Sequence, residues 1–251
     1  MNIIRVRVFN TNYIWFLYNY RGECIIVDPG EAVKVLNILK KLQFKLRAIL
    51  LTHNHFDHIN GVFSLTRYFP KTIVYGPMET KNNGAHCLVS EGDDFVLLQK
   101  KFKVINLTGH TLGHIGFYSA PWLFCGDTVF SAGCGKICVG FAQQMYESFL
   151  KIKHLPRNTL IFSGHEYTLS NINFAISILP RDQSIIDYCN KIIKLSKNNQ
   201  PTVPTTVNLE RKINPFFCCD NLDIKKSLNL PFNLKEEWQV FSALRNKKDS
   251  F

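Results

Sequence analysis

The sequence predicts a layered α/β protein. Over the first two-thirds of the chain, short apolar runs typical of strands alternate with runs that carry apolar residues at helical spacing. The chain has 251 residues, of which 46% are hydrophobic and 20% are charged, a balance typical of a globular protein with a sizeable core. Strands and helices mixed in this order suggest sheets packed against helices.

The expected elements begin with a strand over residues 1–9. There, apolar Ile4 and Val6 alternate with charged residues, which predicts a first strand rather than a signal peptide. Helical spacing of apolar residues predicts helices over residues 31–42 and 59–69. Further strands are expected at residues 24–27, 46–51, 72–75, 95–98, 103–107, 117–119, 122–125 and 159–162.

The C-terminal part of the chain has a different character. After about residue 170, strand-like runs become scarce, and Ile185, Cys189 and Ile192 recur on one helical face. We therefore expect two domains, a catalytic α/β domain over residues 1–169 and a small, mostly helical, substrate-binding domain over residues 170–251.

The composition restricts the class of protein. No apolar run reaches the roughly 18 residues that a membrane span needs. The eight cysteines show no C-x-x-C pair and no zinc-ribbon spacing, which favours reduced thiols in a reducing compartment. The formal net charge is +11, but the basic residues are scattered and form no block of five or six. We expect a cytoplasmic protein, a monomer, that binds neither a membrane nor nucleic acid.

The strongest local signal is the segment 52–58, Thr-His-Asn-His-Phe-Asp-His. A loop that directly follows a strand can turn several side chains toward one point. Imidazole nitrogens and carboxylate oxygens are the ligands that zinc and its first-row neighbours prefer. The segment therefore predicts metal binding by its three histidines and one aspartate, which are His53, His55, Asp57 and His58.

Three more potential ligands follow strand ends further along the chain: His110, Asp127 and His165. Each comes after an apolar run and a glycine, which frees the backbone to turn at the end of a strand. The repetition of one arrangement favours a second half-site, completed by residues from distant parts of the chain.

Several other residues receive a structural interpretation. We expect His114 to orient a neighbour or cap a turn, and His86 and His154 to lie on the surface. Cys134 could ligate a soft metal, but enough harder ligands are present that we assign it to packing. The segment 133–136 is not a phosphate loop, because it lacks a first glycine at the proper distance and a Ser or Thr after the lysine.

The ligand pattern as a whole resembles the metallo-β-lactamase superfamily, whose fold is an αββα sandwich with a dinuclear metal site. Within that superfamily the chain resembles the glyoxalase II family. The resemblance spans essentially the whole chain, helical tail included, and is carried by the segments 124–136, 164–168, 201–204, 214–216 and 244–249.

The resemblance implies two divalent metal ions per chain. The first would be held by three histidines: His53, His55 and His110. The second would be held by Asp57, His58 and His165, with Asp127 bridging the two ions. We expect zinc, although iron and manganese suit the same ligands.

The resemblance also implies the reaction. It is the hydrolysis of the thioester S-D-lactoylglutathione to glutathione and D-lactate, the second step of methylglyoxal detoxification. The metal centre would activate water, and Asp57 and Asp127 would be the catalytic carboxylates. Five residues would contact the glutathione part of the substrate: Lys136, Cys138, Tyr167, Arg245 and Lys248. The family often has an aromatic residue where this chain has Cys138, so we expect that contact to be weakened or altered.

Three alternative functions fit the sequence less well than this interpretation. A persulfide dioxygenase of the same fold would use a single iron held by two histidines and one aspartate, and the complete second ligand set argues against it. A tRNA 3′-end nuclease would explain the positive charge, but the chain has no inserted arm to grip RNA. A metal-binding protein without catalysis is disfavoured, because structural zinc sites are usually closed and cysteine-rich.

Overall fold

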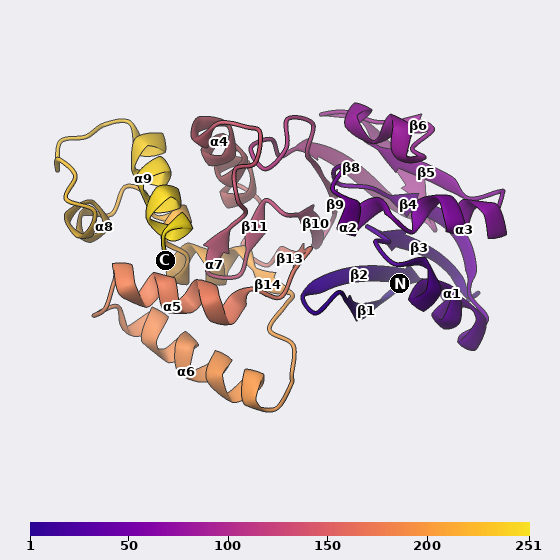
Figure 1. Ribbon diagram of the computed structural model, residues 1–251, viewed down its shortest axis with the longest axis horizontal. Helices are drawn as coiled ribbons and strands as arrows, with labels where there is room; N and C mark the ends of the chain where they lie inside the picture. The colour runs from indigo at the N-terminus through magenta and orange to yellow at the C-terminus, as the bar shows by residue number, and fades with distance from the viewer. The chain divides into compact units, whose positions relative to one another are not determined.

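The computed structural model describes residues 1–251 (Figure 1). The chain forms two compact units. Unit 1 comprises residues Met1–Asn106 and Gly113–Gly126, and unit 2 comprises residues Leu107–Leu112 and Asp127–Phe251. None of the helices has the length and apolar character that crossing a membrane requires.

The first sheet of unit 1 is mixed. Its first three strands pair antiparallel and its last three follow in parallel. In sheet order, the strands are β1 (Asn2–Val8), β2 (Asn12–Tyr18), β3 (Glu23–Val27), β4 (Lys45–Leu50), β5 (Ile73–Gly76) and β6 (Cys87–Leu88). Parallel strands end at the same edge of a sheet, so the loops after β3, β4 and β5 begin side by side.

Helices α1 (Ala32–Lys41) and α3 (Val62–Tyr68) pack against this sheet (Figure 1). Leu39 of α1 and Leu65 of α3 belong to the same buried cluster as Ile49 of β4. This amphipathic packing accounts for the helical spacing of apolar residues in the sequence.

The helix expected over residues 59–69 is α3, which begins three residues later than expected, and a separate short helix, α2 (Phe56–Ile59), precedes it. The chain between them passes close to the loop after β3. A Cβ atom on Gly61 would lie only 2.3 Å from the carbonyl oxygen of Pro29. The two backbones approach each other so closely at the junction of α2 and α3 that only glycine fits at residue 61.

The remaining strands of unit 1 form an antiparallel series: β7 (Asp94–Leu97), β8 (Lys100–Asn106), β9 (Ile115–Ser119) and β10 (Trp122–Gly126). Phe95 of β7 stacks on Tyr75 of β5, with 4.3 Å between the ring centroids. The two sheets of unit 1 therefore pack on each other, with the 3-10 helix η1 (Met78–Asn83) following β5.

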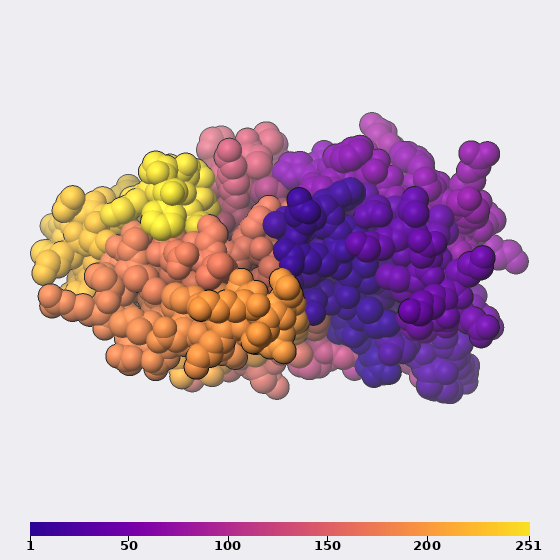
Figure 2. All heavy atoms as spheres, turned by 60° about the horizontal axis from the view of Figure 1, so that its bottom comes forward, coloured from indigo at the N-terminus to yellow at the C-terminus, as the bar shows by residue number.

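Unit 2 is mostly helical. Its helices are α4 (Ala142–Lys153), α5 (Thr168–Ile178), α6 (Gln183–Lys197), α7 (Val207–Ile213), η2 (Pro215–Phe217), α8 (Leu222–Ser227) and α9 (Glu237–Asp249). Its short strands are β11 (Val129–Phe130), β12 (Gly133–Cys134), β13 (Leu160–Ser163) and β14 (Thr205–Thr206). Within this unit, α5 lies beside α6 (Figure 1), and the yellow atoms of α9 lie beside those of α5 (Figure 2).

Aromatic side chains fill the core of unit 2. Phe149 of α4 lies 5.0 Å from Phe241 of α9, and Phe241 lies 5.1 Å from Phe216 of η2, measured between ring centroids. All three are buried. Contacts of this kind fix the C-terminal helix α9 against the rest of the unit.

Candidate metal centre

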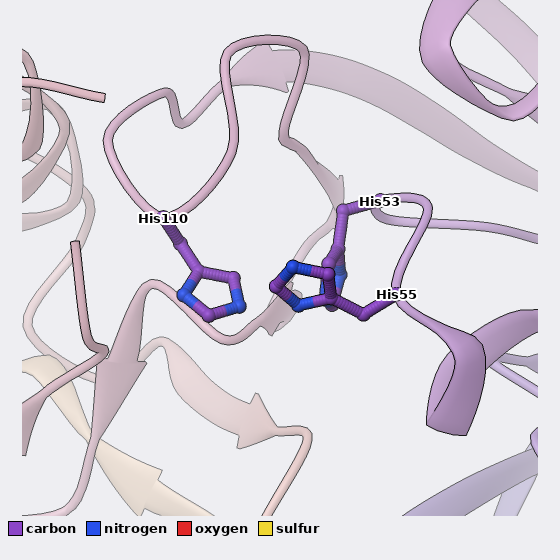
Figure 3. Close-up of side chains that lie close together, drawn as sticks. All are labelled: His53, His55 and His110. Carbon is purple, nitrogen blue, oxygen red and sulfur yellow. The ribbon is translucent and has the colours of Figure 1, made fainter. Parts of the chain in front are cut away.

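The loop after β4 gathers the predicted histidines of unit 1. The ring centroid of His53 lies 4.7 Å from that of His55 and 4.2 Å from that of His58. His53 and His58 are buried, whereas His55 is half-buried. Figure 3 shows His53 and His55 extending from this loop, and His110 extending from the loop that follows β8.

Asp28, at the end of β3, orients two of these histidines. Its buried carboxylate accepts hydrogen bonds from the Thr52 N–H at 2.9 Å and from the Thr52 hydroxyl at 2.7 Å. Its Oδ2 atom lies 3.0 Å from Nδ1 of His58. The Thr52 hydroxyl donates to Asp28, so it accepts from Nδ1 of His53, 2.9 Å away. Both histidines therefore keep Nε2 for a metal ion.

Asp28 also belongs, with His53 and His58, to a group of residues that could hold a metal ion. Both of its carboxylate oxygens are already engaged with Thr52 and His58. This arrangement favours an orienting role for Asp28 over direct ligation.

Asp57 of α2 is held by a residue of strand β2. The side-chain amide of Asn12, at the start of β2, donates to Asp57 Oδ2 at 2.6 Å and to the Asp57 carbonyl at 3.4 Å. The same Oδ2 atom lies 3.7 Å from Nε2 of His58. A Cβ atom on Gly30 would lie 1.8 Å from the Asp57 carbonyl oxygen, so the turn after β3 must carry glycine here.

In unit 2, Asp127 lies between two histidines. Its Oδ2 atom is 3.1 Å from Nε2 of His165 and 3.6 Å from Nε2 of His110, and all three residues are buried. Nδ1 of His110 lies 2.6 Å from the carbonyl oxygen of Lys136. A carbonyl only accepts, so Nδ1 carries the proton and Nε2 of His110 is the nitrogen suited to a metal ion.

Only two of the three glycines that precede His110, Asp127 and His165 have the positive φ angle that favours glycine. Gly109 and Gly126 have φ angles of 133° and 48°, in the region that favours glycine. Gly164 does not have a positive φ. The turn before His165 therefore uses ordinary backbone, whereas the turns before His110 and Asp127 require glycine.

The predicted ligands fall into two sets that could each hold a metal ion: His53, His55 and His110, labelled in Figure 3, and Asp57, His58 and His165. Asp127 lies close to one histidine of each set, as its distances to His110 and His165 show. These seven donors, five imidazoles and two carboxylates with no sulfur ligand among them, suit zinc, iron or manganese. The donor chemistry therefore fits a pair of divalent metal ions.

Three of the predicted substrate contacts lie near these ligands in unit 2. Lys136 is exposed and orients His110 through its own carbonyl oxygen. Cys138 is exposed, with Sγ 3.8 Å from Nδ1 of His110, and partial burial raises the pKa of its thiol. Tyr167 is 38% exposed and stacks on His165 at 4.7 Å between centroids, so it is not a core aromatic residue.

Arg245 and Lys248 project from α9. The guanidinium of Arg245 is buried and donates to the carbonyl oxygens of Cys134 and Gly135 at 2.8 and 3.5 Å. Arg245 thus supports the segment that leads to Lys136. The ammonium of Lys248 lies 4.9 Å from the ring centroid of Phe174, and burial together with Arg245 lowers its pKa to about 8.

The residues given a structural interpretation are placed as expected. His114 is buried and stacks on His53, with 4.7 Å between centroids, a position from which it can orient that neighbour. His86 and His154 are exposed. Cys134 is buried, and burial raises the pKa of its thiol to about 12. A neutral thiol of this kind is a packing residue rather than a ligand.

The sequence analysis identified neither Asn12 nor Asp28 as a functional residue. Asp28 could have been found, because it stands directly after an apolar strand, as the predicted ligands do. Asn12 carries no such signal. Its contact with Asp57 joins residues 45 positions apart in the chain and depends on how the strands are ordered.

Two family models together match nearly the whole chain. The model described as "Metallo-beta-lactamase superfamily" matches residues 7–86 and 88–165. The model described as "Hydroxyacylglutathione hydrolase C-terminus" matches residues 166–251. The predicted fold class, an αββα sandwich with a helical C-terminal part, is confirmed.

Curated relatives agree with these matches. The chain is 82% identical over 251 residues to a hydroxyacylglutathione hydrolase of Blochmanniella pennsylvanica, and the match covers 100% of both chains. It is 53% identical to one of Baumannia cicadellinicola, covering 100% of this chain and 97% of the relative. It is 48% identical to one of Klebsiella pneumoniae, again covering 100% of both chains.

Solved structures show the same fold. The B3 metallo-β-lactamase BLEG-1 has a TM-score of 0.66 at 25% identity, covering 86% of this chain and 99% of that one. ETHE1 from Myxococcus xanthus also has a TM-score of 0.66, at 20% identity, covering 100% of this chain and 99% of that one. With the family models and the relatives, these findings establish that the chain belongs to the hydroxyacylglutathione hydrolase family of the metallo-β-lactamase superfamily.

Proposed function

We propose that this chain hydrolyses the thioester of S-D-lactoylglutathione, releasing glutathione and D-lactate. The relatives that match over its full length are named hydroxyacylglutathione hydrolase. The observation that carries the proposal is the hydrogen bonding of the ligands. His53, His58 and His110 each have Nδ1 engaged as a donor, which places the lone pair of the neutral ring on Nε2, the atom that would ligate a metal ion. Such preorganisation is what a metal-dependent hydrolase requires.

We propose two divalent ions per chain, zinc in the first instance. One would be held by His53, His55 and His110 and the other by Asp57, His58 and His165, and Asp127, which lies close to His110 and His165, would be a further ligand. When bound, such ions lower the pKa of water to about 7 and polarise the thioester carbonyl.

The chain's own residues hold the reacting groups in place. Asn12 fixes the Asp57 carboxylate, which helps to hold the attacking water and accepts a hydrogen bond from it. Asp28 and Thr52 prevent the histidines from turning. The departing glutathione thiolate is a stable leaving group, so the site needs no strong general acid to protonate it.

The glutathione part of the substrate is anionic, and the proposed contacts are suited to an anion. Lys136 and Lys248 supply positive charge, and Tyr167 offers a hydroxyl beside His165. Arg245 acts indirectly, because its guanidinium donates to the carbonyl oxygens of Cys134 and Gly135 and so supports the segment that leads to Lys136. Cys138 supplies no aromatic surface at a position where the family often has one.

The organisation of the protein forms part of the same proposal. Residues 1–169 supply the catalytic domain and residues 170–251 the substrate-binding domain, and the two family models meet close to this boundary, between residues 165 and 166. We propose that the protein acts as a monomer in the cytoplasm, where its eight cysteines remain thiols.

A comparison of two thioesters tests the proposal. The purified chain, loaded with zinc, is given S-D-lactoylglutathione or the lactoyl thioester of N-acetylcysteamine, and loss of thioester absorbance is followed. We expect a much higher kcat/KM for the glutathione thioester. Equal values would contradict recognition of glutathione, and no hydrolysis of either thioester would contradict the proposed reaction.

A further inference from the structure

We infer that Glu79 is a positioning residue that fixes the loop carrying the metal ligands His53 and His55. Its carboxylate joins two backbone segments of unit 1. Oε1 accepts from the N–H of Asn54 at 3.2 Å, and Oε2 accepts from the N–H of Gly113 at 2.7 Å. The inference rests on the proposed metal centre, since it assigns a role toward that centre.

The strand order explains how Glu79 reaches this loop. Glu79 stands in η1, directly after β5, and β5 pairs in parallel with β4. Parallel neighbours end at the same edge of the sheet, so η1 lies beside the loop that follows β4. The hydroxyl of Thr80 anchors the start of η1 by donating to the Pro77 carbonyl at 2.8 Å.

The two N–H groups that Glu79 binds are each next in the chain to a histidine, and the rings of these two histidines, His53 and His114, stack on each other. Asn54 lies between His53 and His55 in the chain, and Gly113 directly precedes His114. The rings of His53 and His114 stack at 4.7 Å with 24° between their planes. By binding the backbone next to both rings, one carboxylate sets the distance between the ligand loop and the residue that supports it.

The sequence is adapted to this contact at Gly113. A Cβ atom at that position would lie 2.7 Å from Oε2 of Glu79 and 3.0 Å from its carboxylate carbon. Any larger residue would displace the carboxylate from the Gly113 N–H. Gly113 and Glu79 are therefore matched to each other in this contact. Neither residue is among the predicted metal ligands or substrate contacts.

The test uses zinc affinity, measured on the full chain by competition with a chromophoric chelator that reports both binding steps. Outer residues of this kind typically contribute 10–100-fold to metal affinity. We expect Glu79→Ala to weaken one of the two steps by about tenfold or more. Glu79→Gln, whose amide oxygen can serve only one of the two N–H groups, should give a smaller loss. The visible spectrum of the cobalt(II)-loaded Glu79→Ala protein should also change.

Asp93→Ala is the matched control. The exposed Asp93 carboxylate also accepts from a backbone N–H in unit 1, that of Ser90 at 2.8 Å. We expect this variant to bind zinc as the parent does and to have the same cobalt spectrum.

The outcomes separate this inference from the proposed function. If the parent binds fewer than two zinc ions tightly, the proposed metal centre fails. If the parent binds two ions, and Glu79→Ala matches it in affinity and spectrum, the inference alone is overturned. If Glu79→Ala does not fold, the zinc affinity of Glu79→Gln tests the inference, and an affinity equal to that of the parent overturns it. Unfolding of both variants in the absence of metal would overturn the inference in favour of a purely structural role.

Discussion

Replacement of Asp28 by asparagine should weaken metal binding while leaving the shape of the site intact. Asp28 Oδ2 accepts from the Thr52 hydroxyl and lies 3.0 Å from Nδ1 of His58. A carboxylate cannot donate, so it holds His58 in the tautomer with the proton on Nδ1. Nε2 then has its lone pair directed away from Asp28.

An asparagine side chain cannot satisfy all three donors. With its oxygen toward the Thr52 N–H, its NH₂ group faces His58 and favours the tautomer with the proton on Nε2. With its NH₂ group toward the Thr52 N–H, a buried donor loses its acceptor, at a cost of about 1–3 kcal/mol. The first orientation satisfies more hydrogen bonds, so we expect it to dominate. Zinc binding must then shift the His58 proton from Nε2 back to Nδ1, and the free energy of this shift lowers the affinity for zinc.

The magnitude follows from what outer residues contribute to metal sites. We expect Asp28→Asn to lower zinc affinity by about 10–100-fold, equivalent to about 1.4–2.7 kcal/mol. Competition with a chelator measures this loss. The control is Asp182→Asn, at the N-cap of α6, where Asp182 accepts from the Ile185 N–H at 3.2 Å. Asparagine caps helices equally well, so this control should match the parent. Zinc affinity of Asp28→Asn within about twofold of the parent would refute the tautomer argument.

The remaining predictions concern unit 2. Burial and Arg245 lower the pKa of Lys248 to about 8. The cation that binds a carboxylate is therefore lost as pH rises through that value, and KM should rise above about pH 8, but not in Lys248→Arg, which stays charged. A KM that does not change between about pH 7 and 9 in the parent would count against Lys248 as a contact. The fully buried Glu210 carboxylate accepts from two hydroxyls, a side-chain amide and a backbone N–H. Glu210→Gln turns one acceptor into a donor and should reduce the free energy of unfolding in urea by about 1–3 kcal/mol, whereas an unchanged value would show that the network tolerates the exchange. Cys138→Tyr should lower KM for the glutathione thioester by restoring an aromatic surface, and an unchanged KM would show that residue 138 does not touch the substrate.

The candidate metal ligands could be singled out in the sequence because their pattern is local. Four of them stand within segment 52–58, and His110 and Asp127 follow glycines that the structure places at positive φ. The residues that orient the ligands are different in kind. Asp28 meets His58 across 30 positions and Asn12 meets Asp57 across 45 positions. Such contacts depend on which strands become neighbours, and no spacing in the sequence reports that.

The elements that escaped prediction also have physical reasons. Strand β2 is buried at six of its seven residues, so it lacks the alternation that marks a half-buried strand. Helix α5 buries Thr168, Asn171 and Phe174 together with aliphatic residues, so it shows no clear polar face. Helix α4 begins after Phe141 rather than after a residue that commonly caps helices.

The interpretation of Arg245 illustrates a further limit of sequence reasoning. The sequence does not report whether the guanidinium of an arginine near the C-terminus is exposed or buried, so Arg245 is predicted as a substrate contact in either case. Here the guanidinium is 6% exposed and donates to main-chain oxygens of the segment before Lys136. Only the packing of α9 against that segment distinguishes a residue that binds an anion from one that supports its neighbour.

The central claim is that thioester hydrolysis by this chain depends on two metal ions, which the predicted ligands, Asp127 among them, would hold. Metal content and S-D-lactoylglutathione turnover, measured side by side in the parent and in Asp127→Ala, test it most directly. We expect about two ions per chain and rapid turnover in the parent, with loss of at least one ion and of nearly all turnover in the variant. Full turnover by Asp127→Ala, or a parent that turns over its substrate with no bound metal, would contradict the account.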